Sequence, residues 1–360
     1  HKMNDAVKKW QTLSRAKRDD DSHKKAVDKA ERDMGWCKSQ YKTICRTKLR
    51  FGDSQTRAVF NLISNKLSTE ARDLSQFDER REVFAFNDIC YDLAAKRWFK
   101  ARKHDYILTT CGKDWRTPTA EECSTVTRLI EGIFFDAEKR KCAVSILHAA
   151  LSGIRHEKFI FFNGGGRNGK GLLCELFMFL LGAYGIAGHQ TLLTKDSSDG
   201  ANQNLRNCHM KRAVMWTEPD KGVAYKVNSI KALSGDEDHA ARGLYAGKAG
   251  EQITRIFATL MCQCNAMPPL SGEKDHALAA RVVKLMFETT FCDPDDPGDA
   301  AMLKMHNPEE GRYFLPMDKS LKSPTFKLAH YCALFQYLTD SCDSLDLYLP
   351  PCTRDAAMEY

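Results

Sequence analysis

The stretch at residues 158–173, KFIFFNGGGRNGKGLL, constrains the fold more than any other part of the chain. It begins with an aromatic-rich apolar run, residues 159–162, that Asn-Gly ends abruptly, and this pattern predicts a buried strand. A glycine-rich loop ending in Lys170 follows, and the apolar spacing after the loop predicts a helix. Strand, glycine loop, lysine and helix in this order are typical of a phosphate-binding P-loop.

The loop itself supplies the residues that we expect to bind a nucleotide: Gly164, Gly165, Gly166, Arg167, Asn168, Gly169, Lys170 and Gly171. Glycines let backbone N–H groups turn toward a polyphosphate, the helix start adds its dipole, and Lys170 can reach the terminal phosphates. A glycine-rich β-turn that binds nothing is the alternative interpretation.

The loop departs from the pattern at Gly171, where a Ser or Thr hydroxyl usually ligates Mg²⁺. Either other carboxylates and water hold the metal, or the site binds nucleotide and hydrolyses it poorly. The sequence leaves both options open.

The run at residues 212–218, RAVMWTE, predicts a second strand, placed beside the P-loop strand and ending in a carboxylate. In P-loop ATPases such an acid coordinates Mg²⁺ or polarises the attacking water. Glu218 is therefore the candidate catalytic and metal-binding residue, with Asp220 as a helper.

A third strand is predicted over residues 255–265, and Asn265 at its end can hydrogen-bond the attacking water or the γ-phosphate. The alternative is an Asn that opens a turn before the following prolines. The run at residues 279–287 begins with a charge, Arg281, and continues as a further predicted strand. Arg281 is a candidate arginine finger for a neighbouring subunit's site. A surface arginine is equally compatible with this pattern.

Basic residues suggest nucleic acid as a partner. Lys231, Arg242 and Lys248 are spread through a polar segment that predicts a β-hairpin with Lys248 at its tip, where lysine grips phosphates without reading sequence. Residues 1–50 hold 15 Lys and Arg against 7 Asp and Glu, and a second basic cluster with interleaved aromatics covers residues 96–106. For residues 1–50 the alternative is a solvated helical surface. For the second cluster it is a basic hairpin whose aromatic residues belong to the core.

Composition excludes several classes of protein. No run of about 18 apolar residues occurs, so we expect no membrane span, and the start of the chain lacks the apolar segment of a signal peptide. None of the 14 cysteines forms a CxxC pair, which argues against a zinc site and favours buried reduced thiols in an intracellular protein.

The order of these parts resembles superfamily 3 helicases, and within them the primase-helicases of poxviruses and other large cytoplasmic DNA viruses. The motifs that carry the resemblance span roughly residues 155–292: the glycine loop, Glu218, Lys231 with Ser234-Gly235-Asp236, Asn265 and Arg281. Phe86-Asn87-Asp88 and Tyr91-Asp92-Leu93 are similar, more weakly, to a small domain that precedes the ATPase in those proteins.

The resemblance implies an AAA+-like ATPase that uses ATP and Mg²⁺ and assembles as a hexameric ring around single-stranded or forked DNA. It implies that Lys170 grips the β- and γ-phosphates, Glu218 serves metal and water, and Asn265 senses the γ-phosphate. Arg281 would be the finger in trans, although Ala280 stands where relatives often have a second arginine. Lys248 would be a DNA contact on a channel loop.

The expected fold is α/β: a P-loop, AAA+-like core with an N-terminal helical or mixed domain and a C-terminal helical cap. The expected domains are residues 1–118 (basic, helical or mixed), 119–292 (ATPase and helicase) and 293–360 (a linker and a helix from about residue 327 to 339).

The expected function is replicative DNA unwinding inside the cell, in the host cytoplasm or nucleus if the protein is viral. Residues 1–150 show no paired-carboxylate primase signature, so we expect the helicase portion here, with a primase domain or other replication proteins as partners. A nucleotide-gated binding ring with weak hydrolysis and a P-loop kinase remain the alternatives.

Overall fold

The computed structural model describes residues 24–33, 35–36, 39, 77–195, 202–218, 222–235, 239–242 and 251–355, with only the backbone of 239–242, 251–253 and 354–355. Contacts divide the chain into two units, residues 1–76 and 77–360. In the first unit residues 24–33 form a helix, as the sequence predicts. The sequence also predicts a second helix, from residue 54 to about residue 74, and this segment lies outside the described residues.

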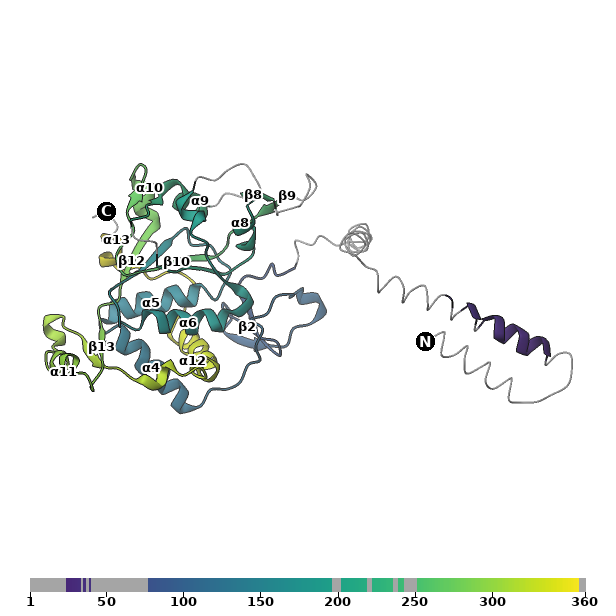
Figure 1. Ribbon diagram of the computed structural model, residues 1–360, viewed down its shortest axis with the longest axis horizontal. Helices are drawn as coiled ribbons and strands as arrows, with labels where there is room; N and C mark the ends of the chain where they lie inside the picture. Colours follow the sequence, from purple (N-terminus) through teal and green to yellow (C-terminus); the bar gives the residue numbers. More distant parts are fainter. Residues whose placement is uncertain are drawn as a thin grey trace. The chain divides into compact units, whose positions relative to one another are not determined.

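A five-stranded parallel sheet forms the centre of the second unit (Figure 1), with the order β12-β4-β10-β6-β5. Its strands are β4 (Phe159–Asn163), β5 (Gly185–Ala187), β6 (Ala213–Trp216), β10 (Thr259–Cys264) and β12 (Val282–Met286). The predicted α/β class is therefore confirmed.

One expectation about this sheet is wrong. The strand that leads to Glu218, β6, does not lie beside the P-loop strand β4, because β10 pairs with both of them. Strands that follow one another in the chain are neighbours in only about two-thirds of cases. The sequence spacing therefore cannot fix which strand takes the central place, and here the mostly buried β10 does.

Helices cover both faces of the sheet, and the alternation of residues along β4 explains the two layers. Phe159 and Phe161 pack with the helices that lie between β5 and β12 in the chain. Ile160 and Phe162 pack with the helices on the other face. A strand buried on both faces reads as a continuous apolar run, as this one does. The first layer contains α7 (Thr191–Thr194), α8 (Gln203–Asn207), α9 (Val227–Ser234) and α10 (His276–Arg281); the second contains α4 (Ala120–Ile133), α5 (Ala137–Ala149), α6 (Lys170–Leu181) and α12 (Phe326–Ser341).

A small antiparallel sheet precedes these layers, in the region for which the sequence predicts strands and turns. Its strands are β1 (Val83–Ala85), β2 (Cys90–Asp92) and β3 (Arg97–Phe99), with β2 in the middle. Phe84 and Tyr91 on one face belong to the same core as α12. The buried Arg212 joins this sheet to the main body, since its guanidinium donates to the carbonyls of Val83 and Leu151, both at 2.6 Å.

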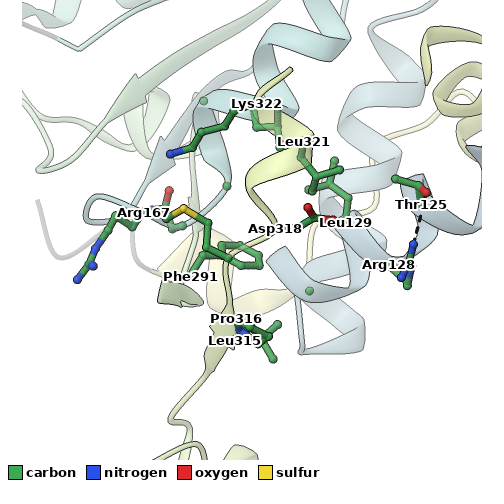
Figure 2. Close-up of a pocket in the computed structure, with 16 residues that line it drawn as sticks. Thr125, Arg128, Leu129, Arg167, Phe291, Leu315, Pro316, Asp318, Leu321 and Lys322 are labelled. Carbon is green, nitrogen blue, oxygen red and sulfur yellow. Dashed lines mark hydrogen bonds between the residues drawn. The ribbon is translucent and has the colours of Figure 1, made fainter. Parts of the chain in front are cut away.

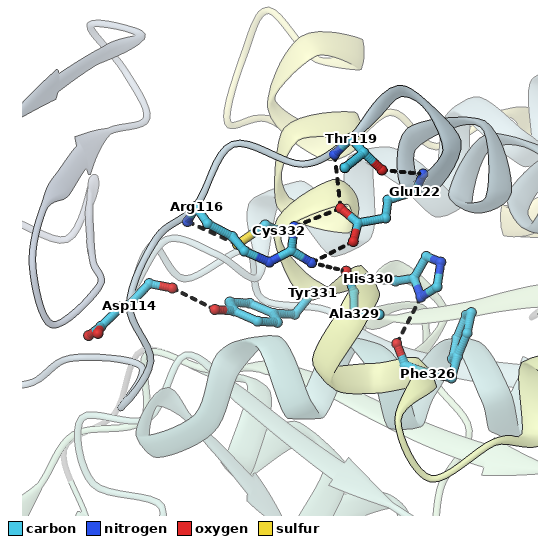
Figure 3. Close-up of polar contacts among 9 residues, drawn as sticks. All are labelled: Asp114, Arg116, Thr119, Glu122, Phe326, Ala329, His330, Tyr331 and Cys332. Atoms are coloured by element: carbon cyan, nitrogen blue, oxygen red, sulfur yellow. Dashed lines mark hydrogen bonds and ion pairs between the residues drawn. The ribbon is translucent and has the colours of Figure 1, made fainter.

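A loop before α4 fastens α12 to the rest of the unit (Figure 3). Arg116 donates to both carboxylate oxygens of Glu122 at 2.7 Å and to the carbonyl of Ala329 in α12. The Tyr331 hydroxyl donates to the carbonyl of Asp114 at 2.6 Å, and Thr119 caps α4. The predicted C-terminal helix is thus confirmed, and it is part of the helical layer.

The division into three domains stays a prediction. Both expected boundaries, near residues 118 and 292, fall inside the second contact unit. The role of residues 293–360 as a cap also stays a prediction.

The remaining elements are short. The hairpin of β8 (His239–Arg242) and β9 (Glu251–Thr254) is antiparallel, as predicted, and β7 (Tyr225–Lys226) pairs with β11 (Leu270–Ser271). The last elements are β13 (Thr290–Cys292), which pairs with β14 (Phe314–Pro316), then α11 (Pro297–Leu303) and α13 (Pro351–Asp355), with the 3₁₀ turns η2 (Lys103–Asp105), η3 (Gly182–Tyr184), η5 (Pro308–Glu310) and η6 (Lys319–Lys322).

Two negative findings apply to the described part of the chain. None of its helices is long and apolar enough to cross a membrane. Its cysteines are free thiols, and most of them are buried, as the sequence predicts.

Candidate nucleotide site

The glycine loop connects the carboxyl end of β4 to the first turn of α6. Gly169 precedes the helix with a φ of 76°, and a Cβ there would lie 2.7 Å from the Ile133 side chain. A Cβ on Gly164 would lie 2.5 Å from the Phe287 carbonyl. These two positions therefore require glycine, which allows the loop to fold tightly over the end of the sheet.

Lys170 lies buried under this loop. Its ammonium donates three hydrogen bonds, to the carbonyls of Gly164 (3.0 Å) and Cys264 (2.7 Å) and to Oδ1 of Asn265 (3.2 Å). Burial lowers the pKa of Lys170. Burial also raises the pKa of the neighbouring Cys262 thiol to about 12, so this thiol is neutral near pH 7 and is not a counter-ion for the lysine.

Asn265 connects the lysine to the candidate acid. Its Nδ2 donates to Oε1 of Glu218 at 2.7 Å, while its Oδ1 accepts from Lys170. Only this orientation of the amide satisfies both neighbours, because a carboxylate accepts and an ammonium donates. Three residues predicted from separate strands and the loop thus form one hydrogen-bonded chain at the carboxyl edge of the sheet, although β10 separates the P-loop strand from β6.

Among the described residues, Glu218 is the carboxylate on which the metal-binding capacity of this site rests. Glu218 is exposed two residues beyond β6. Among the residues that the structure describes, no group of three or more His, Cys, Asp or Glu side chains is placed to hold a metal ion. A single acid fits Mg²⁺ that is held mainly by substrate phosphates and water, and it does not fit a cage built by the protein alone.

Gly171, in the first turn of α6, faces open space. Nothing lies within 4 Å of the position that its Cβ would occupy. The absent hydroxyl is therefore not a consequence of crowding in the folded chain.

A cavity of about 610 Å³ opens beside the loop (Figure 2). Its walls come from α4, the glycine loop and the segments around β13, β14 and η6, and they are largely apolar, with Leu129, Phe291 and Leu321 among them. Figure 2 shows Arg167 and Lys322 on one side and Thr125 and Arg128 on the other. Cavities of this size, mostly apolar with a few polar groups, suit ligands as large as a nucleoside.

The C-terminal segment also holds the loop directly. The guanidinium of Arg167 pairs with Asp299 of α11 at 2.5 Å, and the Phe291 N–H donates to the Arg167 carbonyl at 2.7 Å. The pairing with Arg167 lowers the pKa of Asp299. The sequence does not predict this contact, because the acidic run with two prolines at residues 293–299 is typical of a linker. The signal was present: Asp296 before Pro297 is a helix start, with Asp as N-cap and Pro at the first position.

Arg281 lies away from this site. Arg281 ends α10 at the opposite edge of the sheet, since Val282 pairs with Phe159 at the start of β4. The length of β4, roughly 15 Å, separates Arg281 from the loop. The Arg281 guanidinium donates to the Ala277 carbonyl and lies 3.8 Å from the Glu157 carboxylate. Lys231 pairs with Asp275 at 2.7 Å.

Of the other two predicted DNA contacts, only the backbone of Arg242 is described. Arg242 is at the end of β8, opposite Glu251, and its side chain is not described. Lys248 and Asp220 lie outside the described residues.

Comparisons with known proteins find relatives in large DNA viruses. The chain is 26% identical over 246 residues to protein 022R of Frog virus 3, named as a candidate helicase, covering 65% of this chain and 24% of that protein. It is 24% identical over 222 residues to 121R of Invertebrate iridescent virus 3, also named as a candidate helicase (59% and 23% covered), and 22% identical over 278 residues to Primase D5 of Fowlpox virus (73% and 33%). The predicted resemblance to helicases and primases of large DNA viruses is confirmed.

The extent of the comparisons is limited in two ways. The chain spans about a quarter to a third of the length of these relatives, and no model of a protein family matches it. Among solved structures, the apo NrS-1 C-terminal region is 16% identical with a TM-score of 0.44, over 69% of this chain and 55% of that one.

Proposed function

We propose that the chain is the ATP-hydrolysing motor of a replicative DNA helicase, the helicase part of a viral primase-helicase. The observation that carries this proposal is the hydrogen-bonded chain of Lys170, Asn265 and Glu218 under the glycine loop. It brings a cation, an amide and an acid to the place where the terminal phosphate of a bound nucleotide would lie. The names of the viral relatives support the same class of enzyme.

In this proposal Lys170 exchanges one of its three internal acceptors for a phosphate oxygen when ATP binds. The loop N–H groups and the start of α6 hold the phosphates, and the cavity beside them takes the nucleoside. Once Lys170 turns toward phosphate, the Asn265 Oδ1 is free to accept a hydrogen bond from the attacking water, and the second N–H of its Nδ2 can donate to the γ-phosphate. Glu218 orients and polarises that water.

Glu218 would also hold Mg²⁺ together with water and the nucleotide phosphates. When bound, the ion would neutralise charge on the phosphates and stabilise the transferred phosphoryl group.

The proposal includes an AAA+-like ring around single-stranded or forked DNA, with a hexamer expected from the resemblance. Arg281 at the far edge of the sheet is too distant for its own site, which supports a role as the finger of a neighbouring subunit. Lys231, Arg242 and Lys248 would contact the DNA backbone, with Lys248 in the connection of the β8–β9 hairpin. Lys231 would first have to leave Asp275.

The partners and setting belong to the proposal as well. A primase domain or other replication proteins would act with this chain, because one relative is named a primase. The site of action would be inside the host cell, in the cytoplasm or nucleus.

Gly171 favours a second candidate function, a ring that binds nucleotide and DNA but hydrolyses ATP weakly. The Mg²⁺-ligating hydroxyl usual at this position is missing, and the space for it is empty.

The test measures Mg²⁺-dependent ATP hydrolysis with and without single-stranded DNA for the wild type and three variants. We expect Lys170→Ala to abolish turnover and Glu218→Gln to lower it by about 100-fold or more, with nucleotide binding retained in Glu218→Gln. Lys304→Ala, a change of an exposed lysine in another part of the unit, is the control and should have no effect. Nucleotide binding without turnover under every DNA condition would exclude the motor and support the nucleotide-gated ring.

A further inference from the structure

Residues 96–104, KRWFKARKH, form a basic surface that the proposed function does not use. We name this set the β3 patch. It lies on β3, the residue before it, the turn after it and η2, and its members are Lys96, Arg97, Lys100, Arg102, Lys103 and His104. All six side chains are exposed, and no acidic residue occurs within the segment. Because β3 is an edge strand, a partner can approach it from the side that no other strand covers.

Two nearby carboxylates, those of Asp92 and Asp105, do not pair with the charged side chains of the patch. Asp92 accepts from Arg80 at 2.7 Å and from the Ala95 N–H at 2.9 Å. Asp105 accepts from the Arg102 backbone N–H at 2.7 Å and lies 3.7 Å from Arg80.

One member of the patch has an acidic partner, since Lys96 pairs with the exposed Asp343 at 2.7 Å. Within the part of the chain that the structure describes, Arg97, Lys100, Arg102 and Lys103 have no ion pair. Cations without acidic partners on a surface attract a polyanion, and binding it costs no broken salt bridges.

An aromatic ring is fixed among these cations. Trp98 is 37% exposed, and its inner part packs on Trp115 and Tyr91, with ring centroids 4.4 and 4.7 Å away. The indole is therefore held in place while part of it meets solvent. Rings presented in this way among Lys and Arg side chains serve as stacking platforms for unpaired bases.

The patch also lies at a suitable end of the unit. In Figure 1, β2 of the small sheet and the β8–β9 hairpin are at the end away from α11 and β13. The cavity beside the glycine loop is partly lined by residues of β13 and β14, so it is toward the other end. A polyanion on the β3 patch would leave the nucleotide site open.

From these observations we propose that the β3 patch binds the phosphate backbone of nucleic acid, as a contact separate from the nucleotide site. Lysine and arginine at this surface would neutralise successive phosphates without reading sequence. The exposed part of Trp98 would add stacking when the strand is single.

The test compares the 360-residue chain with its variant Lys100→Gln/Lys103→Gln and with the control Lys304→Gln/Arg312→Gln, which removes two exposed charges elsewhere on the unit. Fluorescence anisotropy measures binding to a labelled 20-nucleotide oligo-dT and to a 20-base-pair duplex, without nucleotide, over a range of salt concentrations. We expect the patch variant to bind about tenfold more weakly at 0.1 M salt. The slope of log K against log salt should fall by about 1.4 on the single strand and 1.8 on the duplex, if each lysine neutralises one phosphate.

The outcomes separate the sources of the ligand and the two proposals. A loss only on oligo-dT assigns the patch to single strands, and a loss on both assigns it to the backbone in general. The proposal is overturned if the patch variant has the same Kd and salt slope as the control variant, which includes the case in which both lose affinity for DNA equally. An acidic protein partner then becomes the next candidate. The binding assay contains no nucleotide, so its result does not depend on whether the chain hydrolyses ATP. An unchanged circular dichroism spectrum shows that the variants fold.

Discussion

At the scale of single residues, the glycines of the loop have different roles. Gly164 and Gly169 are required, since a Cβ at either would approach other atoms to within 2.7 Å. Gly165, Gly166 and Gly171 have nothing within 4 Å of the position that a Cβ would occupy, so no neighbour excludes a side chain there. These three glycines are also exposed, so a ligand can approach their backbone, and Gly171 is a position where a side chain can be added.

Gly171→Ser tests whether the missing hydroxyl limits the metal site. We expect the variant to fold normally and to lower the Mg²⁺ concentration for half-maximal ATP hydrolysis several-fold, because the hydroxyl adds a ligand at the first turn of α6. Gly171→Ala is the matched control, since it gains helix propensity worth up to about 1 kcal/mol without supplying a ligand. Equal Mg²⁺ requirements in the Ser and Ala variants would contradict a role for the hydroxyl.

The residues of the site were predictable because each of them ends a strand or follows a glycine loop. Lys170, Glu218 and Asn265 all stand at such positions, and parallel strands bring their carboxyl ends to one edge of the sheet. What could not be predicted is their mutual hydrogen bonding, which depends on β10 lying between β4 and β6. Strand order is a tertiary property, and spacing along the chain does not encode it.

At the scale of elements, α11 matters through one contact with the loop. Asp299 is buried, and besides Arg167 it accepts from the Asp293 N–H at 2.8 Å, so it connects the start of the C-terminal segment to the loop. Arg167 itself has a positive φ of 60°, an uncommon conformation for a residue with a side chain. The ion pair with Asp299 helps to hold the loop in this conformation before any ligand arrives.

Asp299→Asn tests this support while it keeps the size of the side chain. We expect the affinity for ATP to fall about three- to tenfold, because a loop that is less ordered beforehand loses more entropy on binding. Isothermal titration calorimetry measures the change, and the loss should be smaller at high salt, where the wild-type pair is itself screened. Asp295→Asn is the control, since Asp295 is exposed and pairs with Lys319. Unchanged or tighter ATP binding in Asp299→Asn would show that the pair does not order the loop.

Helices and strands with strong apolar periodicity were predictable, whereas the packing of the C-terminal segment was not. The helical spacing of apolar residues around α4, α5 and α12 predicts a helix and its buried side in each case. The structure places these three helices on one face of the sheet. The spacing does not report that α12 lies among α4, α5 and α6, about 200 residues later in the chain than the first of them. Such long-range contacts arise from the shape of the whole core.

At the scale of the whole molecule, the second unit is held together by contacts that cross both expected domain boundaries. Phe84, Phe86, Tyr91 and Leu93 share one core with α12 and with α4 to α6. Burying four such side chains contributes about 6–12 kcal/mol, which is similar to the entire stability of a typical domain, about 5–15 kcal/mol. The small sheet is therefore expected to be a structural part of this unit.

Two truncations test this dependence. A chain of residues 77–360 should keep the near-ultraviolet circular dichroism of the folded protein, and it should unfold cooperatively in urea. The reason is that the three core clusters contain only residues from Val83 onward. A chain of residues 119–360 should fail to fold, because α12 and the buried Tyr184 would lose their cover. The single change Phe84→Ala in the 360-residue chain should lower the free energy of unfolding by about 3–5 kcal/mol. If residues 119–360 folded with the same midpoint as 77–360, the contacts across residue 118 would be incidental and the expected domain boundary would be real.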